Sequence, residues 1–297
     1  MELILNTNKF GFIPFLETNV DSFIIGLKNF CINQPFSLTI KELKKCLPII
    51  KDTNKKIYLS INLFAKENDI KKLLKILDNI ISLNVDGYIV SDLGILNMLK
   101  KKNQEHKVIL DLQTYVTNKY SANSLLNLGI KRISLSKEIT LNDIKEIANF
   151  NNKNIEVLCQ GYYPITYSKR PILSCYFKNF KLKKTSNIHY IKEENRNDYY
   201  FVLESKNNLT VYNNRQYSLF NNLPELIKNN ISSLRIDSIF MNEIEIKEYI
   251  NLYSLAIDSL TNNNIEEYNK LKTTFNNKYD FDTPFLYNES FLLKEGK

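Results

Sequence analysis

Short apolar runs alternate with amphipathic segments along the first 160 residues of the chain. The runs are rich in isoleucine, leucine and valine, which predicts strands. In the segments between them, apolar side chains recur every three or four residues, as they do on one face of a helix. Strands are expected over residues 3–6, 22–27, 56–63, 87–90, 107–112, 131–135 and 155–159, and helices over residues 40–51, 69–83, 93–100, 121–128 and 140–150.

Repetition of a strand and a helix at this spacing is typical of a parallel sheet with crossover helices. About seven such units are complete soon after residue 160, which favours a closed barrel over an open sheet. The chain has no GxGxxG or GxxxxGK[ST] motif, so the usual nucleotide-binding open sheets lose support. The predicted fold class is therefore α/β, a TIM-barrel-like (β/α)8 fold.

The repeat is interrupted after the seventh strand. Residues 162–215 are basic and aromatic and are predicted to form an insertion, irregular at first and then a hairpin of strands 198–204 and 209–213. A helix over 219–228, an eighth strand over 233–239 and a long helix over 243–260 complete a barrel domain of residues 1–260. Residues 261–297 are expected to be a C-terminal tail packed on the barrel.

The composition is that of an ordinary globular protein, with 43% hydrophobic and 24% charged residues. No apolar run reaches the roughly 18–20 residues that span a bilayer, and the first residues lack the pattern of a secretory signal. The four cysteines lie far apart without a CxxC pair, which indicates neither a zinc ribbon nor a disulfide framework. We therefore expect a cytoplasmic protein that does not enter the membrane.

The formal net charge is +8, and lysine supplies most of it. Abundant lysine, asparagine and isoleucine are also typical of AT-rich coding, so the charge alone leaves nucleic-acid binding and compositional bias as open alternatives. Arginine is scarce, and each one is a stronger candidate for a bidentate contact with an anion. The arginines are Arg132, Arg170, Arg196, Arg215 and Arg235.

Polar residues end several of the predicted strands, where a TIM barrel builds its active site. Asn62, Gln113 and Glu138 follow apolar strands without being the obvious caps of the next helix, so we assign them to the site. Asp92 directly precedes a helix and is expected to cap it.

The last two barrel strands also carry polar residues. Gln160 ends the seventh strand, and Arg235 and Asp237 lie in the eighth. An arginine in a barrel lumen needs an anionic partner. For Arg235 that partner is either Asp237 or a bound anion, and the sequence leaves both alternatives open.

Basic and aromatic side chains are interleaved over residues 162–184, including Lys169 and Arg170. This mixture suits phosphate contacts combined with base stacking, although a solvated basic loop has the same composition. Histidine-based catalysis has little support, because His106 lies in a charged loop, His189 lies in the insertion, and no HExxH motif is present. Cys159, inside an apolar strand, is expected in the core.

Several segments, taken in order, resemble one known family, the collagenase-like peptidase family (peptidase family U32). The segment at residues 156–176, EVLCQGYYPITYSKRPILSCY, is similar to its signature, and the likeness spans essentially the whole chain. The other segments that carry the resemblance are Gly26-Leu27, Asn62, Ser91-Asp92-Leu93-Gly94, Gln113, Thr117-Asn118, Leu135-Ser136-Lys137-Glu138, Asn214-Arg215, Leu223-Pro224-Glu225-Leu226-Ile227 and Leu234-Arg235-Ile236-Asp237.

The resemblance implies a TIM-barrel-like fold and a choice of activities. The family was named for proteolysis, but its better understood members act in hydroxylation of tRNA wobble uridine, of ribosomal RNA or of ubiquinone precursors. The tRNA branch is thought to draw on prephenate as a co-substrate. Many members hold an iron–sulfur cluster with four cysteines.

This chain departs from that cysteine pattern. Pro171 stands where the family signature closes with a cysteine, and Tyr217 stands where another cysteine often lies. The resemblance therefore implies a short branch without a cluster of its own, working beside a longer paralogue in a hetero-oligomer.

From these observations we predict a component of tRNA wobble-uridine hydroxylation that binds tRNA through its basic insertion. The alternatives are a peptidase and a non-catalytic scaffold of a hetero-oligomer. Predicted catalytic or orienting residues are Asn62, Gln113, Glu138 and Asp237, and predicted substrate-binding residues are Gln160, Lys169, Arg170, Arg215 and Arg235. No metal site is assigned.

Overall fold

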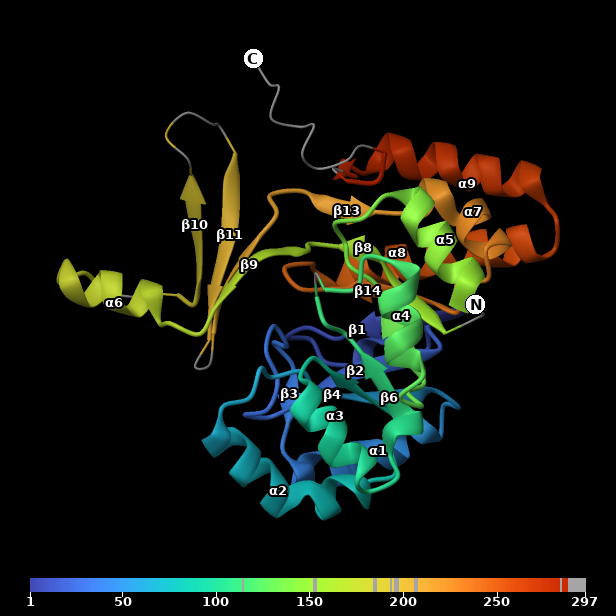
Figure 1. Ribbon diagram of the computed structural model, residues 1–297. Helices are drawn as coiled ribbons and strands as arrows, with labels where there is room; N and C mark the ends of the chain where they lie inside the picture. The colour runs from blue at the N-terminus through green and yellow to red at the C-terminus, as the bar shows by residue number, and fades with distance from the viewer. Residues whose placement is uncertain are drawn as a thin grey trace.

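Eight parallel strands close into a barrel at the centre of the computed structural model (Figure 1), which describes residues 1–113, 115–151, 154–183, 186–192, 194, 198–205, 208–283 and 285–287. The barrel strands are β1 (Glu2–Asn6), β2 (Ser22–Leu27), β4 (Lys56–Ile61), β5 (Gly87–Val90), β6 (Val108–Leu110), β7 (Arg132–Ser134), β8 (Ile155–Gly161) and β14 (Ser233–Asp237). They pair in the order β14-β1-β2-β4-β5-β6-β7-β8, and β14 also pairs with β8. The predicted TIM-barrel-like fold is confirmed.

Helices follow most of the strands and cover the outside of the barrel (Figure 1). The predicted cap is present, since the Asp92 carboxylate accepts hydrogen bonds from the backbone of Gly94 and Ile95. Thr140 and Asp143 also bond reciprocally at the start of α5. Only a single 3-10 turn (Ile13–Phe15) connects β1 to β2. The helices are α1 (Ile40–Lys51), α2 (Glu67–Ile81), α3 (Leu93–Lys100), α4 (Lys119–Leu126), α5 (Leu141–Asn151), α7 (Leu223–Lys228) and α8 (Glu243–Thr261).

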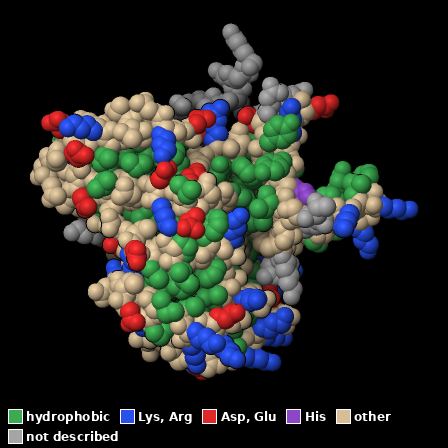
Figure 2. Space-filling view, turned by 180° about the vertical axis from the view of Figure 1, so that it is seen from behind, with side chains coloured by type: hydrophobic (Ala, Val, Ile, Leu, Met, Phe, Trp, Pro, Cys, Tyr) green, Lys and Arg blue, Asp and Glu red, His purple; other side chains and the backbone are tan. Residues whose placement is uncertain are grey.

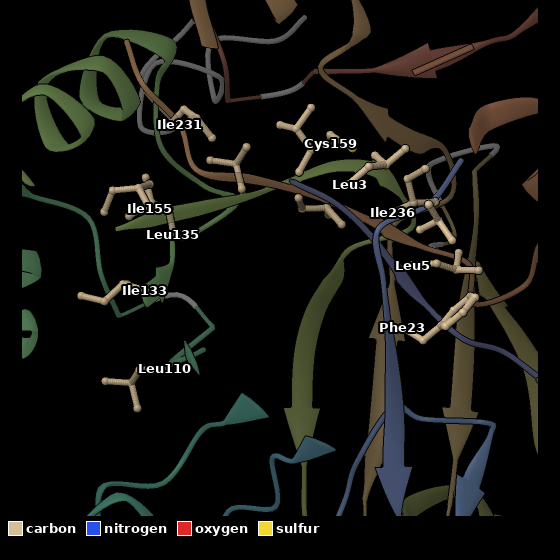
Figure 3. Packing of buried hydrophobic residues seen from close by; sticks show 14 of the residues in the cluster. Leu3, Leu5, Phe23, Leu110, Ile133, Leu135, Ile155, Cys159, Ile231 and Ile236 are labelled. Atoms are coloured by element: carbon tan, nitrogen blue, oxygen red, sulfur yellow. The ribbon is translucent and has the colours of Figure 1, made fainter. Parts of the chain in front are cut away.

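The hydrophobic core has two layers because successive side chains of a strand point to opposite faces. One layer lies between strands and helices and includes Leu3, Leu5 and Phe23 (Figure 3). Cys159 is fully buried in this outer layer, as predicted. The other layer lies in the lumen and is formed by Ile4, Ile24, Tyr58, Ile89 and Ile109.

The insertion between β8 and β14 forms an antiparallel sheet of four strands beside the barrel (Figure 1). The predicted hairpin is confirmed, although residues 206 and 207 of its turn lie outside the described part. The expectation that residues 162–198 are irregular was wrong, because β9 pairs with β12, some 40 residues later, and local periodicity does not report such pairing. The elements are β9 (Pro164–Ser168), α6 (Ile172–Asn179), β10 (Ile188–Lys192), β11 (Tyr199–Glu204) and β12 (Leu209–Tyr212).

The C-terminal segment adds a helix that the sequence analysis missed, α9 (Ile265–Lys278). It packs on α8, and Phe275 stacks on Phe220 with ring centroids 4.2 Å apart and planes within 3°. Strand β15 (Phe281–Asp282) then pairs with β13 (Gln216–Ser218). In the described part of the chain, no helix is long and apolar enough to cross a membrane.

Candidate functional site at the barrel mouth

Two adjacent cavities lie at the C-terminal ends of the barrel strands, next to the inserted sheet. We call the larger one, of about 230 Å³, the outer cavity, and the smaller one, of about 30 Å³, the chamber. Both are bordered by Asn33, Gln113, Lys137 and Pro164. The outer cavity is also lined by Ile32, Phe64, Leu112, Glu138, Ile165, Thr166 and Tyr167, and the chamber by Asn6, Gln34, Asn62, Ile89, Asp111, Leu158, Tyr212, Arg235 and Asp237.

Arg235 is the centre of a buried ionic cluster that borders the chamber. Its Nη2 atom donates to Asp111 Oδ2 at 2.8 Å and to Ser134 Oγ at 2.6 Å, and its Nε atom lies 3.4 Å from Glu156 Oε1. The direct ion pairs of Arg235 are thus with two carboxylates that the sequence analysis did not offer, while Asp237 contributes only a longer-range electrostatic effect. Asp111, at the end of β6, and Glu156, in β8, supply the negative charge.

Lys137 adds a second cation to this cluster from the loop after β7. Its Nζ atom lies 3.8 Å from Asp111 Oδ1. Burial by itself would raise the pKa of Asp111, but Lys137 and Arg235 more than offset this effect and hold that pKa at about 2. Burial lowers the pKa of Lys137, against the opposing effect of Asp111. Asp111 is thus ionised, and Lys137 loses its proton more easily than an exposed lysine does.

Two carboxyl groups near the cavities have pKa values that are raised, in contrast to the lowered pKa of Asp111. Burial raises the pKa of Asp237, against the opposing charge of Arg235, and burial likewise raises the pKa of Glu138 beside Lys137. The backbone N–H of Ile239 donates to Asp237 Oδ1 at 3.3 Å. Carboxyls with raised pKa values beside a cavity can exchange protons near neutral pH more readily than ordinary ones.

The structure brings several of the predicted residues together at these cavities. Gln113 borders both, with a positive φ of 61°, and its N–H donates to Asp111 Oδ1 at 3.1 Å. Asn62 lines the chamber, but its amide is bonded to the backbone N–H and C=O of Ile32 at 2.8 and 3.1 Å. Asn62 therefore positions the loop after β2 rather than offering free polar groups.

Other predicted residues lie outside the two cavities. Gln160 is fully buried and bonded to Gln216 at 2.7 Å and to Tyr253 of α8 at 3.2 Å, so its placement in the site is corrected. The register of β8 against β14 shifts near this position, which alternation along the strand does not predict. Lys169 and Arg170 are exposed between β9 and α6.

Arg215 belongs to a separate polar cavity of about 380 Å³. Its guanidinium lies 3.9 Å from Asp280 Oδ1, and Glu138 borders this cavity as well as the outer cavity. Arg196 and Lys184 lie outside the described residues.

The residues at the cavities that were not assigned from the sequence include Asp111, Lys137, Tyr167 and Tyr212. Asp111 and Lys137 lie at strand ends next to residues that were assigned, so their positions carried the signal. Tyr167 lies in the basic and aromatic segment 162–184, which was singled out for RNA contact and not as part of a cavity wall. Tyr212 carried no signal, because it reaches the barrel only through the inserted sheet.

The four cysteines do not converge on a cluster site. Cys31 follows β2, Cys46 is on α1, Cys159 faces the core from β8, and Cys175 is exposed on α6. Among the described residues, no group of three or more His, Cys, Asp or Glu side chains is placed to hold a metal ion. The side chains present do not fit an iron–sulfur cluster.

Comparison with known proteins places this geometry in a family. The family model described as Peptidase family U32 matches residues 9–294. The chain is 21% identical to tRNA hydroxylation protein P2 of Bacillus subtilis over 97% of both chains, and 27% identical to an uncharacterized protease of Methanocaldococcus jannaschii over 89% of this chain and 68% of that one. A solved U32 peptidase superposes with a TM-score of 0.50 at 11% identity, over 80% of this chain and 92% of that one. Since the family model covers almost the whole sequence, the chain belongs to peptidase family U32.

Proposed function

We propose that this protein takes part in tRNA hydroxylation, the conversion of wobble uridine to 5-hydroxyuridine. The observation that carries the proposal is the pairing of a base-sized cavity with an adjacent basic, aromatic arm. The similarity to a tRNA hydroxylation protein over 97% of both chains supports the same interpretation.

The outer cavity has the character of a pocket for a flipped pyrimidine. Its walls are largely apolar, and Phe64 and Tyr167 meet there edge to face with ring centroids 5.1 Å apart. Gln113, Lys137 and Glu138 supply a few polar groups to one side. Enzymes that act on a nucleobase hold it outside the stack between apolar side chains and read its edge with such groups.

The arm, residues 161–183, projects from the molecule beside this cavity (Figures 1 and 2). It carries five cationic side chains and no aspartate or glutamate. Tyr176 and Phe180 are 51% and 58% exposed, with ring centroids 4.7 Å apart. Cations for phosphates beside exposed rings for bases are what RNA contact requires. The cations are Lys169, Arg170, Lys178, Lys181 and Lys183.

The arm is held in place by a carboxylate of the inserted sheet. Glu204 of β11 accepts hydrogen bonds from the backbone N–H of Leu173 at 2.8 Å and of Ser174 at 3.0 Å. These residues lie in the first turn of α6, where a negative charge stabilises the helix N-terminus. The arm therefore presents its rings and cations on an anchored helix.

The geometry favours RNA modification over proteolysis by a histidine-assisted nucleophile. His106 is exposed, and His189 lies 2.8 Å from the Ser186 carbonyl oxygen and packs on Phe177. Neither histidine borders the cavities described above. A Ser–His or Cys–His pair is thus not assembled there among the described residues.

By the family resemblance we also propose prephenate as a co-substrate and a longer paralogue as the partner subunit. Because the cysteines of this chain do not converge, any iron–sulfur cluster of the complex would belong to that partner. Co-purification of the tagged chain from its own cells, followed by identification of the bound proteins, tests the partner directly.

Nucleoside mass spectrometry of tRNA tests the function. We expect 5-hydroxyuridine and its derivatives to fall when the gene is deleted and to return when the wild-type chain is expressed from a plasmid. Other modified nucleosides in the same digests are the internal control. Unchanged 5-hydroxyuridine in the deletion strain would refute the proposal.

A further inference from the structure

Tyr212 brings a hydroxyl group from the inserted sheet into the barrel mouth. The side chain is 1% exposed, and its ring packs edge-on against Phe240 with centroids 5.0 Å apart. Tyr212 borders the chamber together with Asp237, whose charge contributes to the raised pKa of the phenol, after the larger effect of burial. Tyr212 therefore contributes to the chamber wall within electrostatic reach of Asp237.

Apart from Arg235 Nε, which has an ionic contact with Glu156, two buried polar atoms of residues in the chamber wall have no hydrogen-bond partner among the described residues. They are Tyr212 Oη and Gln34 Oε1. The other half of the Gln34 amide is engaged, since Nε2 donates to Asn6 Oδ1 at 2.5 Å. Unpaired buried polar atoms cost folding free energy, and when several face one small cavity they indicate a ligand group that completes them.

The size of the chamber and the charges around it limit what that group can be. A volume of about 30 Å³ admits only one or two non-hydrogen atoms. Three cations balance three carboxylates in the lumen, and burial favours the neutral form of Asp237. The cations are Arg132, Lys137 and Arg235, and the carboxylates are Glu2, Asp111 and Glu156. Each of these charged groups already has a partner of opposite sign, which favours an uncharged group in the chamber.

We propose that the chamber binds the hydroxyl group that the reaction attaches to the pyrimidine held in the outer cavity. A hydroxyl both accepts and donates, so it can accept from Tyr212 Oη–H and donate to Gln34 Oε1. This assignment rests on the proposed function and adds a role for the inserted sheet, which completes the binding site as well as carrying the arm.

The test compares binding of two anticodon stem-loop RNAs that carry either uridine or 5-hydroxyuridine at the wobble position. We expect the wild-type chain to bind the hydroxylated RNA about 5- to 10-fold more tightly, the effect of one added hydrogen bond to a buried partner. In Tyr212→Phe we expect this preference to fall to near one, because the added hydroxyl loses its donor.

Tyr88→Phe is the matched control. Tyr88 is also fully buried with an unpaired hydroxyl, but it borders none of the cavities at the barrel mouth. We expect both substitutions to raise the melting temperature by about 2–4 °C, because each removes an unpaired buried hydroxyl. Only Tyr212→Phe should abolish the preference for 5-hydroxyuridine.

Three outcomes would overturn the proposal. If the wild-type chain binds the two RNAs with equal affinity, the chamber does not recognise the hydroxyl group. If Tyr212→Phe still prefers the 5-hydroxyuridine RNA, Tyr212 does not bind that group. A fall in the melting temperature of Tyr212→Phe assigns the hydroxyl to folding rather than binding. Failure to bind either RNA, together with unchanged tRNA in the deletion strain, instead refutes the proposed function on which the inference rests.

Discussion

The two ends of the barrel lumen contain similar ionic chemistry used in different ways. At the N-terminal end, Arg132 Nη1 donates to Glu2 Oε2 at 2.7 Å, and Tyr58 Oη donates to Glu2 Oε1 at 2.6 Å. At the C-terminal end, Arg235 pairs with Asp111, but Lys137 and Asp237 beside them face the chamber. Glu156 lies between the two arginines, 3.7 Å from Arg132 and 3.4 Å from Arg235.

We infer that the N-terminal end of the lumen stabilises the barrel and that the C-terminal end forms the binding site. The Tyr58 ring and the Glu2–Arg132 pair fill the N-terminal end, which is where barrels place stabilising residues. Arg132 Nε also lacks a hydrogen bond, but the unpaired atoms at the C-terminal end, Gln34 Oε1 and Tyr212 Oη, belong to residues that line a cavity. Buried ion pairs therefore close the barrel at one end and shape a site at the other.

The largest loss of stability is expected at the N-terminal end of the lumen, which the Glu2–Arg132 pair closes. Arg132→Met leaves Glu2 and Glu156 buried with less compensating charge, which should lower the free energy of unfolding by about 3–5 kcal/mol. Urea denaturation followed by circular dichroism measures it. A loss below about 1 kcal/mol would contradict the assignment of this cluster to stability.

The second largest effect is expected from acid, which should destabilise the fold by protonating Glu2 at the same end of the lumen. Burial would raise the pKa of Glu2, but Arg132 and Tyr58 more than offset it and hold that pKa at about 2, below the usual 4.5. A lowered pKa stabilises the fold above pH 4.5, and about 3 kcal/mol of this should be lost as the pH falls from 4.5 toward 2. Urea midpoints between pH 6 and 2.5 measure the slope. Glu2→Gln should flatten it, and an equally steep slope in that variant would assign the effect to other carboxylates.

At the open end, function should change more than stability. Lys137→Met should reduce 5-hydroxyuridine in complemented deletion cells by at least about tenfold, because the cavities lose their buried ammonium group. Stability should fall less than in Arg132→Met, since Asp111 keeps its 2.8 Å bond to Arg235. If a stably expressed Lys137→Met variant restores normal 5-hydroxyuridine levels, Lys137 is not needed for the reaction.

The smallest effects are expected on the arm. Replacing Lys178, Lys181 and Lys183 by glutamine should weaken tRNA binding and lower the slope of log affinity against log salt by about 0.7 for each phosphate that is no longer neutralised. The matched control replaces three exposed lysines of α2 on the barrel, Lys71, Lys72 and Lys75. Equal losses of affinity in both triple variants would indicate general attraction by a basic protein instead of a binding arm.

The candidate site was partly predictable because it lies where a barrel fold requires it. Gln113, Glu138, Arg235 and Asp237 were found by their positions at strand ends, and they line the cavities. Gln160 was assigned as a strand end, but β8 continues to Gly161, and Gln160 pairs there with Ser218 of β13, a partner that local patterns do not reveal.

The sequence by itself determined the order and type of the barrel elements. Helix α1 (Ile40–Lys51), strand β5 (Gly87–Val90) and helix α3 (Leu93–Lys100) begin and end at the predicted residues. Apolar periodicity and helix caps are local properties, and each strand–helix unit contains them within some 25 residues.

Only the tertiary structure decided how the insertion meets the barrel. Tyr167 and Tyr212 lie on β9 and β12, which pair across some 40 residues, and both reach cavities whose other walls come from distant strands. Likewise, Arg235 finds its partner Asp111 124 positions earlier in the chain. Such contacts arise from strand order and barrel closure, so no local pattern of residues encodes them.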